Sequence, residues 1–320
     1  MSTTGEKKAM ERTIMAWNLR TRTLELGRRT LLGGVVNITP DSFSDGGLFL
    51  NHEAAIAHGI RLLDEGADLL DLGAESTRPG SKTGSQASGA EGFAQAPAVS
   101  AEEEQARLLP VLVGILAAEP NAVISVDTYK ATTARAAVAA GAEIVNDVSG
   151  LFWDSGMAEA CAEAGCGVVL MHTRGRPEEW RTQPQLAPNE VLATVEAGLA
   201  ASLARAAHAG IAAERIVLDP GYGFGKKFDE NFALLERQAE LLSLGRPLFV
   251  GVSRKSFLGR ALATLYGGRD APVEARETAS LAAMVAAILN GASVVRVHAV
   301  RPALDAARVA DAVVNAGNRE

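Results

Sequence analysis

Cysteine and aromatic residues are scarce in this chain of 320 residues. The two cysteines, Cys161 and Cys166, are too few for a disulfide framework, and no second cysteine or histidine pair accompanies them to complete a zinc site. We therefore predict that both are small buried hydrophobic residues in a reducing compartment, the cytoplasm. Aromatic residues make up 5% of the chain, which is too little for a protein that binds its ligand on an aromatic platform.

Long hydrophobic runs and an excess of basic charge are also missing. No stretch of about 18 uncharged apolar residues occurs, so we expect no membrane span, and the polar opening segment does not resemble a secretory signal. The chain has 31 basic and 38 acidic residues, a net charge of −7. A nucleic-acid-binding protein needs a basic surface, so we do not expect nucleic acid as a partner. An anionic small molecule stays open as a ligand, because the field of a pocket is local.

Short apolar runs alternate along the chain with longer segments that have helical periodicity. Continuously apolar runs are typical of parallel strands that are buried on both faces. Eight strands with a helix after each predict an α/β protein with the (β/α)₈ TIM-barrel fold. A doubly wound sheet is the alternative, but it carries a glycine fingerprint after its first strand, where this chain has NITPDSFSDGG. The predicted strands span 31–38, 67–73, 122–127, 142–147, 167–172, 215–219, 247–253 and 292–298.

Two segments fall outside this alternation. Residues 1–30 precede the first strand, and within them AWNLRTRTLELG predicts a short β-hairpin over the N-terminal mouth of the barrel. Residues 81–100 are rich in glycine, alanine and serine and lack periodicity, so we expect a mobile loop between the second strand and its helix. That helix should begin after Ser100, which has Glu103 three residues later as in a capping box. We thus predict one domain, a barrel over 31–317 with an N-terminal extension and a loop insertion.

Polar side chains occur at the end of every predicted strand. In a barrel, chemistry takes place at the C-terminal ends of the strands. A single Asp or Asn there is often a turn or cap residue, but buried carboxylates at so many ends need hydrogen-bond donors, and we expect a ligand to supply them. The polar residues are Asn37, Thr39, Asp41, Asp45, Asp71, Glu75, Ser76, Thr77, Arg78, Asp127, Asn146, Asp147, His172, Asp219, Ser253, Arg254, Lys255, Arg296 and His298.

The types of these side chains suggest two parts of the ligand. Asp127, Asn146 and Asp219 offer acceptors and an amide, which suit the N–H edge of a planar heterocycle. Lys255 would serve a carbonyl oxygen or a ring nitrogen of the same molecule.

A second group suggests an anion. Arg296 and His298 stand two residues apart on one predicted strand and therefore face the same side, next to Asn37 on the first strand. An arginine, a histidine and an oxygen ligand for a hard metal suggest a phosphate or diphosphate bound with Mg²⁺.

Eight motifs occur in the order found in the dihydropteroate synthase family. They are NITPDSFSDGG, DLGAESTRPGS, SVDTYK, NDVSG, LMHTRG, DPGYGFGK, GVSRKSFLG and VRVH, and they cover residues 31 to 300. Each is weak alone, but together they are specific, and the chain resembles these pterin-binding enzymes. The resemblance implies a cytoplasmic transferase of folate biosynthesis that joins p-aminobenzoate to (7,8-dihydropterin-6-yl)methyl diphosphate, giving 7,8-dihydropteroate and diphosphate. It also implies Mg²⁺, a homodimer and inhibition by sulfonamides; the helix at 278–290 and the last helix are candidate dimer faces.

The resemblance also implies a role for individual residues. The pterin would be bound by Asp127, Asn146, Asp219 and Lys255, with Asp219 on the edge that carries the 2-amino group and N3. The diphosphate would be bound by Asn37, Thr77, Arg296 and His298, with the intervening Val297 also a substrate-binding residue and Asn37 also the Mg²⁺ ligand. The p-aminobenzoate site would be lined by Asp41, Asp45, Arg78, Phe224 and Ser256. The residues expected to act in catalysis are Asp127, Lys255, Arg296 and His298.

Three features depart from the family pattern. The segment 81–100 is longer than usual, Ala74 stands where many members have glycine, and Ala299 follows His298 where members more often have an acid. We expect Ala299 to affect the start of the next helix more than the chemistry. One alternative is a pterin-binding methyltransferase of the same fold, which has no diphosphate to bind; the motifs SRK and RVH favour the synthase. Others are a non-catalytic paralogue, a sugar-phosphate barrel, or an aldolase that uses Lys255 as a Schiff base.

Overall fold

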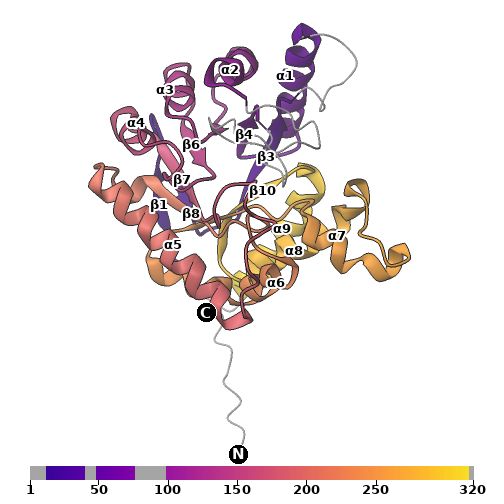
Figure 1. Cartoon of the computed structure of the whole chain (residues 1–320). Coiled ribbons are helices and arrows are strands. Elements are labelled where there is room, and N and C mark those ends of the chain that lie inside the picture. The colour runs from indigo at the N-terminus through magenta and orange to yellow at the C-terminus, as the bar shows by residue number, and fades with distance from the viewer. Residues whose placement is uncertain (1–11, 40–47, 76–98, 317–320) are drawn as a thin grey trace, which may run out of the picture.

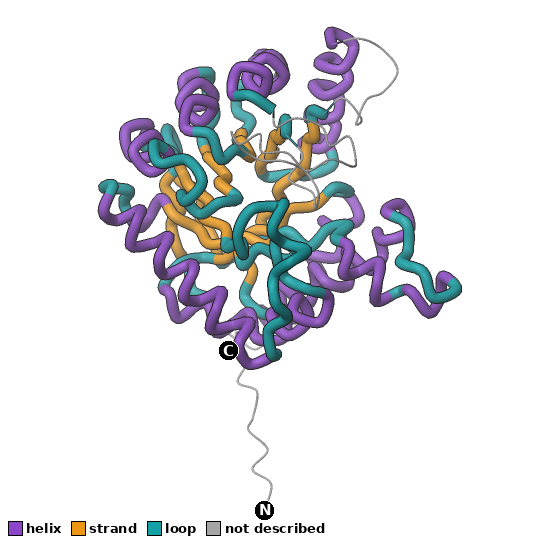
Figure 2. Tube along the Cα trace, viewed as in Figure 1, coloured by secondary structure: helices purple, strands orange, loops and turns teal. Residues whose placement is uncertain are grey.

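Eight parallel strands form a closed barrel in the order β10-β3-β4-β5-β6-β7-β8-β9. The structure, a computed structural model, describes residues 12–39, 48–75 and 99–316. Figure 2 shows the strands as an inner ring with the helices outside it. The predicted TIM barrel is therefore confirmed. The strands are β3 (Leu31–Asn37), β4 (Leu69–Gly73), β5 (Ile124–Asp127), β6 (Ile144–Asp147), β7 (Gly167–Met171), β8 (Ile216–Asp219), β9 (Leu248–Val250) and β10 (Ala292–Val297).

Helices connect successive strands of the barrel. The α-helices are α1 (Leu48–Asp64), α2 (Ala101–Ala118), α3 (Ala131–Ala139), α4 (Met157–Ala164), α5 (Pro188–His208), α6 (Phe228–Arg237), α7 (Ser256–Ala261), α8 (Glu277–Leu289) and α9 (Val300–Asn315). Short 3₁₀ helices are η2 (Ala213–Arg215), η3 (Gln238–Leu244), η4 (Ala263–Tyr266) and η5 (Val273–Arg276). Around α7 the chain projects from the side of the barrel (Figure 1).

Two helix starts test expectations from the sequence. The side chain of Ser100 accepts a hydrogen bond from the backbone N–H of Glu103, so α2 begins where the capping pattern predicts. Ala299 is the residue that precedes α9, and its methyl group provides no side-chain cap. This departure from the family pattern therefore lies at a helix start, where an acid would favour the positive end of the helix dipole.

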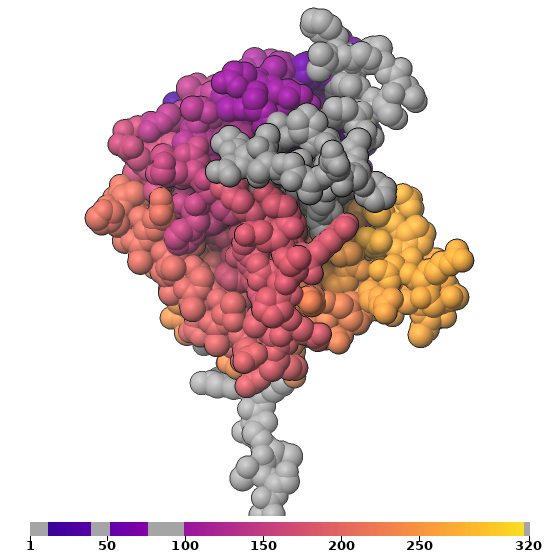
Figure 3. All heavy atoms as spheres, viewed as in Figure 1, coloured from indigo at the N-terminus to yellow at the C-terminus, as the bar shows by residue number. Residues whose placement is uncertain are grey.

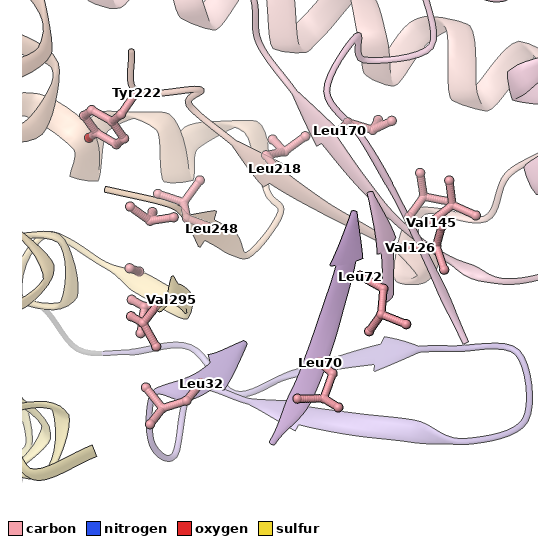
Figure 4. Close-up of a cluster of buried hydrophobic side chains, with 14 of the residues drawn as sticks. Leu32, Leu70, Leu72, Val126, Val145, Leu170, Leu218, Tyr222, Leu248 and Val295 are labelled. Atoms are coloured by element: carbon pink, nitrogen blue, oxygen red, sulfur yellow. The ribbon is translucent and has the colours of Figure 1, made fainter. Parts of the chain in front are cut away.

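Side chains alternate between the two faces of each strand. Those that face outward pack against the helices and form the main hydrophobic core; Leu32, Leu70, Val126 and Leu218 are examples (Figure 4). Those that face inward near the N-terminal end of the barrel form an apolar floor. The floor consists of Leu31, Leu69, Val123, Ile144, Val169, Val217, Phe249 and Val294.

An antiparallel hairpin closes the barrel below this floor. It consists of β1 (Met15–Asn18) and β2 (Thr23–Leu26), as the sequence predicts. Trp17 is fully buried against the floor, and its indole Nε1 donates a hydrogen bond of 2.9 Å to the carbonyl of Arg215. The hairpin therefore seals the N-terminal end and leaves the other end of the barrel for a ligand.

Two expectations drawn from absences can be compared with the structure. Cys161 on α4 and Cys166 before β7 are both buried free thiols. Across residues 12–39, 48–75 and 99–316, no helix is both long and apolar enough to cross a membrane. The proposed insertion at 81–100 lies almost wholly outside the described residues.

Candidate active site

A small hollow opens at the C-terminal end of the barrel. The segment between β7 and α5 lies in front of the barrel on the face shown in Figure 3. Most of the residues that line the hollow were predicted from the ends of the strands. The lining residues are Asp127, Asn146, Val148, Met171, Asp219, Phe224, Gly251, Ser253, Lys255, Arg296 and His298.

Strand alternation places the polar lining directly above the apolar floor. On β10, Val294 belongs to the floor, so Arg296 and His298 point into the barrel above it. The same step of two residues leads from Val217 to Asp219 on β8 and from Ile144 to Asn146 on β6. On β8 and β10 the barrel interior thus changes from hydrocarbon to charge within two residues.

Arg296 is held between two carboxylates. Its Nε donates to Asp71 Oδ2 at 2.5 Å, and its Nη2 donates to Asp127 Oδ2 at 3.2 Å. Both are ion pairs inside the barrel, where charge-assisted hydrogen bonds are strong. The guanidinium therefore lies on one wall of the hollow, linking β10 to β4 and β5.

Asp71 is among the polar residues of the predicted strand ends, but the sequence analysis assigned it no role in binding or catalysis. It lies on β4, is fully buried, and does not line the hollow. Besides Arg296, it accepts hydrogen bonds from Ser125 Oγ at 2.6 Å and from Asn146 Nδ2 at 3.2 and 3.3 Å. A signal was available in the sequence, because Asp71 is the polar residue in the middle of an otherwise apolar strand.

Burial shifts the pKa values of three groups in the hollow. It raises the pKa of Asp127 to about 7 against the opposing effect of Arg296, and that of Asp219 to about 6 against a hydrogen bond from the backbone of Gly221. It lowers the pKa of Lys255 to about 8. The Lys255 Nζ also lies 3.9 Å from the centre of the Phe224 ring. Acceptors and one ammonium therefore meet in a space with little water to compete for them.

Lys226 was missed, and it holds the loop that follows β8. Its ammonium donates to the carbonyls of Gly221, His172 and Phe224 at 2.7, 3.2 and 3.4 Å. Burial lowers its pKa to about 7. Gly221 has a φ of +69°, and a Cβ there would lie 1.9 Å from the carbonyl oxygen of His172, so only glycine fits this turn. The turn brings Phe224 to the rim of the hollow.

Ser253 orients the imidazole of His298. Its hydroxyl lies 3.0 Å from Nδ1 of His298 and also accepts a hydrogen bond from the backbone N–H of His298 at 3.4 Å. Both residues line the hollow. Because Nδ1 meets the hydroxyl, Nε2 is the ring atom on the opposite side of the imidazole.

Some predicted residues lie elsewhere. Val297 alternates with Arg296 and His298, and its side chain packs in the core between the barrel and the helices. Ser256 is the exposed first residue of α7 and does not line the hollow. Asp41, Asp45, Thr77 and Arg78 lie outside the described residues.

Two residues expected at the mouth have structural roles instead. Asp147 faces outward and accepts hydrogen bonds of 2.8 Å from the backbone N–H groups of Ser149 and Leu151, so it shapes a turn. His172 is buried, and a Cβ on Gly198 of α5 would lie 2.4 Å from its ring. Each directly follows a residue that lines the hollow and so belongs to the outward-facing series of its strand, and the expectation that they join the mouth is wrong.

The residues present fit Mg²⁺ only as an ion that the substrate helps to hold. Within the part of the chain that the structure describes, no group of three or more His, Cys, Asp or Glu side chains could hold a metal. Asn37 ends β3 on the inward-facing series that begins at Leu31. One amide oxygen suits Mg²⁺, which keeps several waters and commonly binds substrate phosphate oxygens.

Comparisons with known proteins agree with this geometry. A family model described as pterin binding enzyme matches residues 33–298. The chain is 43% identical over 286 residues to dihydropteroate synthase of Mycobacterium leprae, covering 89% of this chain and 93% of that protein.

Two solved structures are also similar. Dihydropteroate synthase of Xanthomonas albilineans with 4-aminobenzoic acid has a TM-score of 0.79 and 40% identity, covering 94% of this chain and 98% of that one. The Yersinia pestis enzyme in complex with a sulfonamide drug has a TM-score of 0.80 and 36% identity, covering 94% of this chain and 100% of that one.

Proposed function

The chain belongs to the dihydropteroate synthases, a family of pterin-binding transferases, and we propose that it joins p-aminobenzoate to (7,8-dihydropterin-6-yl)methyl diphosphate. The products are 7,8-dihydropteroate and diphosphate. The observation that carries the proposal is the convergence of Asp127, Asn146, Asp219, Lys255 and Arg296 on one hollow. A methyltransferase of the same fold would have no use for the arginine, lysine and histidine gathered at that mouth.

The pterin would bind deepest, against the carboxylates. Asp219 would accept from the 2-amino group and N3, and Asp127 and Asn146 would meet the rest of the polar edge of the ring. Lys255 would donate to a carbonyl oxygen or ring nitrogen. Each of these four lines the hollow, and a buried carboxylate that accepts two N–H groups recovers the hydrogen bonds it lost on burial.

The diphosphate would lie toward β10 and β3. Arg296 and His298 point into the barrel from β10, which pairs with β3 on the side of Asn37. Thr77 is the fourth residue that we assign to this anion. When bound beside Asn37, Mg²⁺ would neutralise charge that develops on the leaving diphosphate.

The p-aminobenzoate would bind outside the pterin, toward the solvent. Phe224 at the rim of the hollow offers an aromatic face, and Ser256 follows Lys255 at the start of α7. We assign Arg78, Asp41 and Asp45 to the same site. The amine of this substrate is neutral at pH 7, so its lone pair can attack without removal of a proton by a strong base.

The reaction is a substitution at the methylene carbon. The C–O bond to diphosphate breaks with its electron pair on oxygen, where Arg296 and His298 stabilise the charge. The electron-rich dihydropterin stabilises the positive charge left on the methylene. The amine lone pair then forms the C–N bond, and the nitrogen loses one proton to solvent.

The direct test is product formation. The protein is incubated with the pterin diphosphate, p-aminobenzoate and Mg²⁺, and dihydropteroate and diphosphate are measured. We expect both products in equal amounts, and less of them when EDTA or a sulfonamide is added, with p-aminobenzoate reversing the sulfonamide effect. A folded protein that forms neither product would instead support a non-catalytic paralogue.

We also propose a cytoplasmic homodimer. Two free thiols suit a reducing compartment. On α9, Val309 and Val313 have exposed fractions of 66% and 59%, and Leu289 at the end of the neighbouring α8 has 39%. A second copy that packs on these helices would cover them. Sedimentation should show a dimer for the natural chain and a monomer for the double variant Val309→Asp, Val313→Asp.

A further inference from the structure

Asp71 lies below the residues that line the hollow and has no access to solvent. Three side chains from three other strands donate hydrogen bonds to its carboxylate: Ser125 on β5, Asn146 on β6 and Arg296 on β10. Two of these three line the hollow, whereas Asp71 does not. The carboxylate of Asp71 therefore links β4 to three other strands. Two of its partners, Asn146 and Arg296, are residues to which the proposed function gives a role in binding.

We propose that Asp71 is a positioning residue that fixes Arg296 and Asn146 in the orientation in which they bind the pterin diphosphate. This inference rests on the function proposed above. For Asn146, the Nδ2 group is turned toward Asp71, so the amide oxygen is directed away from it and serves as an acceptor. For Arg296, Nε is held by Asp71 and Nη2 by Asp127, so the guanidinium plane cannot rotate.

The register of the strands explains how Arg296 reaches Asp71 across the barrel. Arg296 on β10 pairs with Gly33 on β3, and β3 in turn pairs with β4. Asp71 stands opposite Val35, two residues beyond Gly33, and the side chain of Arg296 spans β3 to reach it.

Asparagine cannot replace aspartate at this position. All three partners of Asp71 present hydrogen atoms to it, and a carboxylate accepts at both oxygens. An amide has one oxygen, so its NH₂ group would face Arg296, Asn146 or Ser125, and at least one donor would lose its acceptor. The variant Asp71→Asn keeps the size of the side chain and removes its charge, which isolates the positioning effect.

The test compares the kinetics of Asp71→Asn with those of the natural chain. We expect kcat/KM for the pterin diphosphate to fall by about 10- to 100-fold, the range seen when groups that orient ligand-binding residues are removed. The KM for p-aminobenzoate should change little, because Asp71 has no contact with the rim. Ser125→Ala, which removes one donor and no charge, should shift the same constant in the same direction by less.

Asp311 provides a matched control. It is a buried aspartate that accepts from Arg12 at 2.7 Å and from the hydroxyl of Thr30 at 2.8 Å, at the opposite end of the barrel. Asp311→Asn should lower the resistance to urea without changing either KM. If Asp71→Asn and Asp311→Asn have the same kcat/KM for the pterin diphosphate, Asp71 is only structural and the proposal is wrong.

Two further results keep the inference separate from folding and from the proposed function. If Asp71→Asn does not fold, Ser125→Ala decides, and an unchanged kcat/KM for the pterin diphosphate overturns the proposal. If the natural chain forms no dihydropteroate, the proposed function fails. Calorimetry with pteroic acid then tests Asp71 alone, since weaker binding by Asp71→Asn than by Asp311→Asn supports its role and equal binding contradicts it.

Discussion

Two buried aspartates pair with arginine at opposite ends of the barrel, and they differ in what their other partners do. At the N-terminal end, Asp311 binds Arg12, the backbone N–H of Thr30 and the hydroxyl of Thr30. At the C-terminal end, the partners of Asp71 are all side chains, and two of them reach the hollow. A buried aspartate–arginine pair therefore stabilises the backbone at the N-terminal end of the barrel and orients ligand-binding side chains at the C-terminal end.

The two ends of the barrel also differ in the polarity of the residues that surround each aspartate. The lower end is filled by hydrocarbon and sealed by Trp17 of the hairpin, whose only polar atom is paired with a carbonyl. The upper end gathers two carboxylates, an arginine, a lysine and a histidine around open space. We expect changes at the lower end to alter stability alone, and changes at the upper end to alter catalysis.

The largest effect should come from Arg296→Met. It removes a donor to the leaving diphosphate, which should lower turnover by about 10²- to 10³-fold. It also leaves Asp71 and Asp127 without their shared cation, and breaking a buried pair costs about 3–5 kcal/mol of unfolding free energy. Diphosphate release and urea titration measure the two effects. Unchanged turnover would show that Arg296 does not bind the diphosphate.

Trp17→Ala should have an effect of similar size at the other end, on stability only. Truncating a fully buried tryptophan costs about 3–5 kcal/mol of unfolding free energy. The midpoint of urea unfolding should fall accordingly, while both KM values and kcat stay at those of the natural chain below the transition. A changed KM would mean that the apolar floor transmits strain to the hollow, and the two ends could no longer be treated as separate.

The pH dependence should sharpen the contrast further. With a pKa of about 7, Asp127 is a charged acceptor only above that pH, and Lys255, with a pKa of about 8, is a charged donor only below its own. We therefore expect kcat/KM for the pterin diphosphate to rise up to pH about 7 and to fall above pH about 8. In Asp127→Asn the acidic limb should move toward pH about 6, where Asp219 titrates. If the acidic limb of the pH profile stayed near pH 7, the group that titrates there would not be Asp127.

The smallest effect should come from Ser253→Ala. It removes the hydroxyl that meets Nδ1 of His298, and one hydrogen bond is worth about 1 kcal/mol, or roughly fivefold in kcat. Ser202→Ala is the control, because Ser202 is also buried but its hydroxyl donates to the carbonyl of Gly198 on α5. Equal rates in the two variants would show that His298 needs no orientation by Ser253.

The barrel could be predicted from the sequence because its signal is local. Each strand is a short apolar run with a helix after it, and neither feature depends on distant residues. The residues that line the hollow could also be predicted, since the C-terminal ends of parallel strands meet by construction. Asp127 and Asp219 needed no more information than their place after an apolar run.

The parts of the site that were misplaced or missed depend on which face of a strand each residue occupies and on the register between strands. Neither can be read from the positions of the strand ends alone. Val297 was placed with its neighbours, although strand alternation puts it on the opposite face from Arg296. His172 and Asp147 were assigned to the mouth by the same simplification. Asp71 was listed among the polar residues but received no role, because its importance comes from Arg296, which lies 225 residues away and reaches it through the pairing of β10 with β3.

The long separation in sequence between Asp71 and Arg296 has a consequence for how the chain folds during synthesis. The half of the pocket on β4 to β6 is synthesised early, but its arginine arrives with the last strand, which must pair with the first to close the ring. Contacts of such long range form late and slowly. A nascent chain therefore has no complete pocket until β10 has left the ribosome. In the folded protein, a substrate that contacts both β10 and β5 stabilises the closed barrel, in which β10 pairs with β3. Its binding therefore protects the chain from unfolding.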